Sequence, residues 1–113
     1  PVESREAALA GLFAVTLDRL NADRATLISG IKRYARGQHS LAEKVAAETR
    51  ALDTLRQQPS PDPAQLSDLE TARTWDTRVF SDRQHSLRLV CDQPVLVEQR
   101  AFALARIIQE QLP

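Results

Sequence analysis

The residues Gln58-Pro59-Ser60-Pro61-Asp62-Pro63 interrupt an otherwise helical chain near its centre. Each proline lacks a backbone N–H and pushes the residue before it out of the α-helical region, so this segment cannot be helix. Asp62 followed by Pro63 also matches the N-cap and first position of a new helix. We therefore predict a turn over 58–63 that joins an arm of about 4–57 to an arm of about 64–112, within a single helical domain of residues 1–113.

Apolar residues recur on both sides of this turn with the three- and four-residue spacing of a coiled coil. Before the turn the stripe runs through Phe13, Leu17, Leu20, Arg24, Leu27, Ile31, Tyr34, Gln38, Leu41, Val45, Glu48, Leu52 and Leu55. After the turn it runs through Leu66, Leu69, Arg73, Asp76, Phe80, Arg83, Leu87, Val90, Pro94, Val97, Ala101, Leu104, Ile108 and Gln111. Strand signals are weak, because aromatic residues are only 4% of the chain. The sequence predicts an all-α fold, an elongated antiparallel helical hairpin that resembles a coiled coil.

Folding the chain about the centre of the turn predicts the register of the two arms. Residues whose numbers add to about 121, within about two, should face each other. Most of the resulting pairs are apolar, such as Leu52 with Leu69. The polar interruptions also coincide, because Glu48 falls near Arg73 and Gln38 falls near Arg83. We expect these polar pairs to lower core stability while helping to fix the register.

Several other positions carry helix-boundary signals. Asp92 with Pro94 predicts a helix start, and we expect a kink near Pro94 because proline removes a helical donor. Asn21 or Asp23 could also cap a helix, and Gly37 followed by Ser40-Leu41-Ala42-Glu43 resembles a C-terminal glycine and a capping box. Ser81-Asp82-Arg83-Gln84 is a second capping-box match. If several of these breaks were real, the chain would instead form a compact four-helix bundle or a five-helix bundle.

The segment Val95 to Leu112 is the most apolar part of the chain, and its apolar residues cover more than one helix face. One neighbouring arm cannot bury all of them. Leu96 and Ile107 share a second face, and Leu104 lies at its edge. We predict that these three residues form an interface with a second copy of the chain, which would give a dimeric four-helix bundle.

Charge is unevenly distributed although the total is zero, with 15 basic and 15 acidic residues. Between Arg24 and Ala42 there are four basic residues and no acidic one, and Arg78, Arg83 and Arg88 outnumber Asp82 between Thr77 and Cys91. The predicted register places these stretches side by side. The sequence therefore predicts a basic band that binds an anion or an acidic partner, formed by Lys32, Arg33, Arg36, His39, Arg83, His85 and Arg88.

Composition excludes several other classes. A neutral chain is not a strongly basic nucleic-acid binder, so no nucleic acid is expected as a partner. No apolar run approaches the roughly 18 residues that span a bilayer. We expect no metal site and no cofactor, because His39, His85, Asp82 and Cys91 show no metal-ligand spacing and no phosphate-binding glycine loop occurs. Cys91 is interpreted as a small buried residue and Trp75 as a core or interface anchor.

These observations favour a non-enzymatic α-helical interaction or structural module, dimeric, with an unknown protein partner. The alternative is a helical-bundle, ligand-sensing ectodomain of a membrane-anchored bacterial protein. A hairpin brings both termini together, as a domain inserted between two membrane helices requires, and a start without Met suits an excised segment. The compartment stays open between cytoplasm and periplasm.

Overall fold

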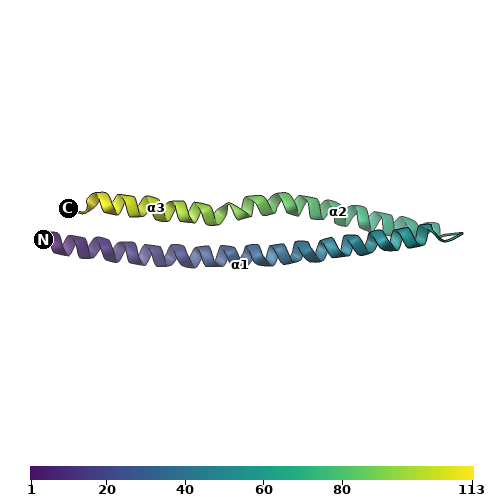
Figure 1. The fold of residues 1–113 in the computed structure, drawn as a ribbon, viewed down its shortest axis with the longest axis horizontal. Helices are drawn as coiled ribbons and strands as arrows, with labels where there is room; N and C mark the ends of the chain where they lie inside the picture. Colours follow the sequence, from purple (N-terminus) through teal and green to yellow (C-terminus); the bar gives the residue numbers. More distant parts are fainter. The chain divides into compact units, whose positions relative to one another are not determined.

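The computed structural model describes all 113 residues and is 91% helical, with no strands. It contains three helices, α1 (Val2–Arg56), α2 (Pro63–Cys91) and α3 (Gln93–Gln111). The all-α prediction is therefore confirmed. The helices pack as two compact units, which are described separately (Figure 1). Unit 1 comprises Pro1–Ile31 with Leu89–Pro113, and unit 2 comprises Lys32–Arg88.

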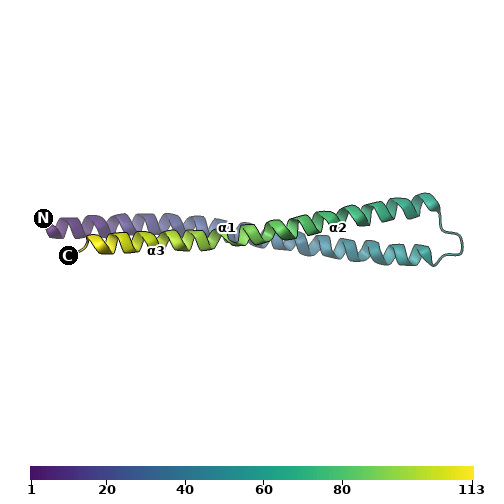
Figure 2. The ribbon, with the colours of Figure 1, turned by 90° about the horizontal axis from the view of Figure 1, so that it is seen from above.

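Unit 2 is a helical hairpin in which the later part of α1 runs antiparallel to α2 (Figure 2). Residues 57–62 form the connection, in agreement with the predicted proline turn. The N-cap prediction is also confirmed, because the Ala64 amide donates to Asp62 Oδ1 at 3.1 Å, one residue after Pro63 begins the helix. This bond satisfies one of the free amides at the start of α2.

Unit 1 pairs the first part of α1 with α3, again antiparallel, so that the two chain ends lie side by side (Figures 1 and 2). Arg5 Nη2 donates to Gln111 Oε1 at 3.2 Å near these ends. Further along the pair, Arg24 Nε donates to Glu98 Oε1 at 3.0 Å as an exposed ion pair. Polar contacts thus connect the two helices along the edges of their apolar contact.

The predicted kink near Pro94 is confirmed as a helix break at Asp92, between α2 and α3. Pro94 occupies the first turn of α3, where a missing N–H costs no helical hydrogen bond of that helix. One detail of the prediction is wrong, since the Asp92 side chain makes no capping hydrogen bond. Asp92 itself keeps right-handed helical dihedrals, so the chain barely leaves the helical conformation at this point.

The other predicted helix boundaries are wrong, because Asn21, Asp23, Gly37 and Ser40 all lie inside α1 and Ser81 lies inside α2. No glycine has a positive φ, so Gly37 does not form the left-handed end of a helix. The chain consequently has three helices rather than the four or five of a compact bundle. A continuous apolar stripe on one face outweighs isolated capping signals when a long neighbouring helix covers that stripe.

The predicted register is confirmed in unit 2 by cross-helix contacts. Lys44 pairs with Asp76 at 3.1 Å, and Gln38 donates to Gln84 Oε1 at 3.0 Å, so the paired numbers add to 120 and 122. In unit 1 the Arg24–Glu98 pair adds to 122 and agrees with it, whereas the Arg5–Gln111 bond near the chain ends adds to 116 and lies outside the predicted range. The predicted Glu48–Arg73 contact is wrong, because Glu48 contacts Asp76 instead and Arg73 makes no ion pair. Arg73 sits about one helical turn before Asp76, and this small offset changes the chemical partner of Glu48.

The cores of both units are thin. Only five apolar side chains are buried, Leu52 and Leu55 in unit 2 and Pro94, Val97 and Ile108 in unit 1. Leu52 is the one large side chain that is 0% exposed. A helix with a single neighbour can bury only one stripe, so most stripe residues stay half-buried at its margins.

We expect Gly37→Ala to stabilise the protein by roughly 0.5–1 kcal/mol, because glycine in a helix interior costs backbone entropy. A methyl group at Gly37 would meet no atom within 4 Å. Urea unfolding followed by circular dichroism measures the change. The matched control is Ala35→Gly, an exposed site in the same helix that should lose a similar amount. A destabilised Gly37→Ala variant would show that α1 requires glycine at this position.

Candidate functional site

Exposed apolar side chains are concentrated in unit 1. The large apolar residues with high exposure in this unit are Val2, Leu12, Val15, Leu89, Val95, Leu96, Phe102, Ile107 and Leu112. Unit 2 has only Trp75 in this class. Scattered apolar residues are normal on a protein surface, whereas a contiguous group marks a binding surface.

An open depression shows which of these residues share one side of unit 1. It is lined by Asp23 and Thr26 of α1 and by Leu96 and Arg100 of α3, among others. Residues seven apart keep the same side in a left-handed helix pair, so Leu12 lies on the side of Thr26, two heptads earlier. Ile107 lies on the side of Arg100 by the same rule. Leu12, Leu96 and Ile107, with Val15 one turn from Leu12, form a surface that we call the apolar patch.

The apolar patch contains two of the three residues predicted from sequence as an interface. Leu96 is 43% and Ile107 is 58% exposed, while Leu104 is half-buried between the helices. The sequence reasoning missed Leu12 and Val15, which belong to a second heptad series on α1. That series continues through Arg19 and Thr26, and its polar members hide the pattern.

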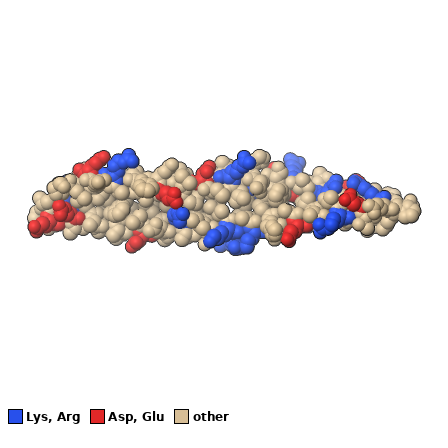
Figure 3. Space-filling view, in the orientation of Figure 1, with Lys and Arg blue, Asp and Glu red and all other residues tan.

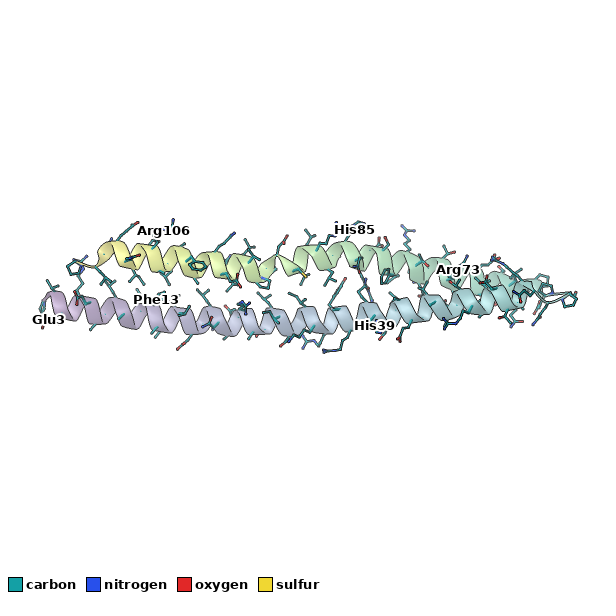
Figure 4. All side chains as sticks on the ribbon, in the orientation of Figure 1. Glu3, Phe13, His39, Arg73, His85 and Arg106 are labelled. Atoms are coloured by element: carbon teal, nitrogen blue, oxygen red, sulfur yellow. The ribbon has the colours of Figure 1, made fainter.

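A second group of exposed apolar side chains lies on another face of α3. Phe102 is 72% exposed, and Val95 stands one heptad before it and shares its face. This face differs from that of Leu96, because consecutive residues on a helix point about 100° apart. Phe13, by contrast, points from α1 toward α3 and lines a depression with Ile108 (Figure 4). Unit 1 therefore carries apolar surface on more than one side.

Unit 2 contains a polar cluster between its helices, formed by Lys44 and Glu48 of α1 and Asp76 of α2. Lys44 Nζ lies 3.1 Å from Asp76 Oδ2, and Asp76 is buried. Hydrogen bonding from Lys44, followed by that from Glu48, lowers the pKa of Asp76 below its ordinary value. Burial, followed by the contact with Asp76, raises the pKa of Glu48. The ion pair with Asp76 raises the pKa of Lys44.

Two further polar contacts cross unit 2. Gln38 is buried and donates through Nε2 to the Phe80 carbonyl and to Gln84 Oε1, each at 3.0 Å. Tyr34 donates its hydroxyl to the Arg83 carbonyl at 3.0 Å. The sequence placed Gln38 near Arg83, and this position is confirmed, because Gln84, the next residue after Arg83, accepts from Gln38. These bonds can form in only one alignment of the helices, which ties the register to specific side chains.

The predicted basic residues all belong to unit 2 and are all exposed. Lys32, Arg33, Arg36 and His39 lie on α1, whereas Arg83, His85 and Arg88 lie on α2. His85 is nine residues from Asp76, so it points to the side of α2 away from α1 (Figure 4). Arg36 is two residues from the inward-facing Gln38 and points away from α2. These two residues, expected as neighbours, therefore lie on opposite outer surfaces of the helix pair.

Few of these basic residues have a hydrogen-bond or ion-pair partner within the chain. His39 Nε2 contacts Glu43 Oε1 at 3.1 Å within α1, and Arg83 contributes only its backbone carbonyl to Tyr34. His85 and Arg88 line one open depression on α2 together with Phe80. On the visible face Lys and Arg are interspersed with Asp and Glu in both units (Figure 3). The cationic side chains are available to an acidic surface rather than arranged as a closed anion pocket.

Two single residues differ from their predicted environments. Trp75 is 64% exposed and is not part of the core, and it lines an open depression with Glu70 and Arg78. Cys91 is exposed instead of buried, because it ends α2 beside the break. No group of three or more His, Cys, Asp or Glu side chains is close enough to hold a metal ion. None of the three helices combines the length and the apolar composition required to cross a lipid bilayer.

No family model, curated protein or solved structure matches this chain. Its own surfaces are therefore the basis for its function. The apolar patch offers contact area, and the polar cluster of unit 2 offers titratable groups between two helices. The first suits association with another protein, and the second suits a response to pH.

We expect the single tryptophan, Trp75, to report an exposed environment in the isolated chain. Its fluorescence should be red-shifted and readily quenched by both iodide and acrylamide, because most of the indole contacts water. Mutation of Trp75 to Phe provides the spectroscopic blank. Emission typical of a buried indole in the folded protein would show that another molecule covers this face of α2.

Proposed function

We propose that this chain is a non-enzymatic α-helical interaction module that forms a homodimer through the apolar patch. The observation that carries the proposal is the imbalance in unit 1, where nine large apolar side chains are exposed and only Pro94, Val97 and Ile108 are buried among the apolar side chains. Two paired helices bury only the faces that they turn toward each other. Stable domains normally bury the remaining apolar faces against a further layer of secondary structure. A second copy supplies that layer.

The size of the surface supports a dimer. Unit 1 contains α1 from Val2 to Ile31, so its side is roughly 45 Å long at 1.5 Å per residue. Two helices packed about 8–10 Å apart present a face about 20 Å wide. The resulting area of about 900 Å² is comparable to the roughly 800 Å² per partner that a stable interface buries.

A two-fold dimer through this side would join two helix pairs into a four-helix bundle. Leu12, Leu96 and Ile107 would then occupy the positions that apolar residues occupy in the core of such a bundle. The ion pair between Arg19 and Asp23, at 3.3 Å, lies on the same side of α1. Its long arginine can extend to the rim of the interface while its stem covers apolar surface.

Ile107→Glu should weaken the dimer roughly 30-fold or more, the change produced by about 2 kcal/mol, because it places a charge in each half of a symmetric contact. Helicity should persist, since Ile107 is 58% exposed whereas its neighbour Ile108 is buried. Sedimentation equilibrium measures the association, and circular dichroism measures the helicity. Gln109→Glu, an exposed site outside the apolar patch, is the matched control and should leave the dimer intact. A wild-type chain that is monomeric at high concentration contradicts the proposal.

We further propose that the basic residues of unit 2 bind an extended acidic peptide that reaches both outer surfaces of the helix pair, because Arg36 and His85 lie on opposite surfaces. Support comes from the exposure of all seven and from the small number of acidic partners that they have within the chain. Exposed cations attract an acidic surface over about 8–10 Å at physiological ionic strength.

The variant Arg36→Glu, combined with Arg88→Glu, should weaken binding of a polyglutamate peptide about tenfold or more. Raising the salt concentration should weaken wild-type binding as well, because exposed charges are screened. Titration calorimetry at two salt concentrations provides the measurement. The control is Arg5→Glu with Arg106→Glu, which makes the same charge change at exposed positions of unit 1 outside the apolar patch and should leave binding unaltered. Equal weakening in both double variants would mean that only net charge matters.

The second candidate is a ligand-sensing ectodomain. The side-by-side chain ends in unit 1, joined by the Arg5–Gln111 hydrogen bond, favour it, because a domain inserted between two membrane helices requires adjacent ends. Apolar spans directly before and after this segment in the full gene would support the sensor. Flanking soluble sequence would favour the interaction module.

A further inference from the structure

The polar cluster of unit 2 places two carboxyl groups face to face between packed helices. Asp76 is 9% exposed, and one oxygen of Glu48, Oε1, is shielded from water and has no hydrogen-bond partner. Lys44 is the only cation in contact, at 3.1 Å from Asp76. The cluster lies close to the core residue Leu52, which is one turn after Glu48 on α1.

Two carboxyl groups can hydrogen-bond to each other only when one of them carries a proton. Asp76 is held ionised by the Lys44 ammonium, as the lowering of its pKa indicates. A negative charge is less favourable on Glu48 than on Asp76, because burial is the main cause that raises the pKa of Glu48. Glu48 is therefore the donor, and Asp76 is the acceptor.

We propose that Glu48 and Asp76 form a proton-operated clasp between α1 and α2, closed when Glu48 is protonated and loosened when it is not. In the closed state one proton and one ammonium serve two carboxyl groups, and the cluster is neutral. When Glu48 releases its proton to solvent, the hydrogen bond is lost and two carboxylates share one ammonium. The cluster then carries one net negative charge between the helices, which weakens the local packing of unit 2.

Few other charged groups face this cluster. On α1 the groups next to Glu48 are Lys44, already paired, and apolar or hydroxyl side chains such as Val45, Thr49 and Leu52. On α2 the other partly buried charge nearby is Arg73, which makes no ion pair with Glu48. The ammonium of Lys44 therefore remains the single compensating charge in contact with the two carboxyl groups.

The direction of the pH effect follows from these environments. A group with a raised folded-state pKa contributes stability that is fully present below its ordinary pKa, here 4.5, and is lost as pH rises through the raised value. Asp76 acts oppositely, because its lowered pKa contributes stability above 3.8 that is lost only in stronger acid. Unit 2 should therefore be most stable in mildly acidic solution and should loosen as the pH rises further.

The test compares wild type with Glu48→Gln, because glutamine keeps an N–H donor for Asp76 but cannot lose a proton. Thermal unfolding and amide hydrogen exchange of unit 2 are measured from about pH 4 to about pH 8. The melting temperature of wild type, and the protection of amides near Leu52, should fall as pH rises above 4.5, whereas Glu48→Gln should lose much less. The gap between the two proteins should widen with pH.

Two further measurements decide the interpretation. Asp53→Asn removes an exposed carboxyl group from the same helix and should keep the wild-type pH dependence. Carbon-13 NMR of the Glu48 carboxyl group in wild type should show titration above 4.5, independent of how any variant folds. The proposal is overturned if Glu48 titrates at or below 4.5, if Glu48→Gln keeps the wild-type slope, or if Asp53→Asn also loses it.

Discussion

Each helix in this protein packs against one neighbour along any part of its length, and this constraint governs the rest of the structure. Such a contact buries a single stripe, which is why so few apolar residues are buried, namely Leu52, Leu55, Pro94, Val97 and Ile108. Polar groups that enter the stripe, such as Gln38 and Asp76, are buried there and bond across to the neighbouring helix. Apolar groups outside the stripe have no protein to cover them and remain available for another molecule.

The fold was predictable because its signals are local and repeated. Three closely spaced prolines can only be a turn, and a heptad stripe on each side of it requires an antiparallel partner. The errors came from single-residue signals: Gly37 and Ser81 match helix boundaries but lie within helices. Such signals are worth about 1 kcal/mol each, which a long packed helix outweighs. The Glu48 partner was missed because register alone does not distinguish residues one turn apart.

Part of the candidate surface was also visible in the sequence. Leu96 and Ile107 were identifiable because the last helix has more apolar residues than one neighbour can cover. Leu12 and Val15 were not identifiable, because the heptad series that contains them on α1 also contains arginine and threonine. The structure adds the decisive fact that Thr26 and Leu96 line the same depression. This shared depression shows which outer face of α1 lies on the same side as which outer face of α3. The periodicity within each helix does not specify this relation.

The two units solve the problem of a thin core differently. Unit 2 places Gln38, Lys44, Glu48 and Asp76 at its helix contact and exposes a single large apolar residue, Trp75. Its polar contacts are satisfied in one alignment only, so they specify the register at some cost in stability. Unit 1 has an apolar helix contact with further apolar residues around it. Such a composition favours association but does little to specify the register of the helices.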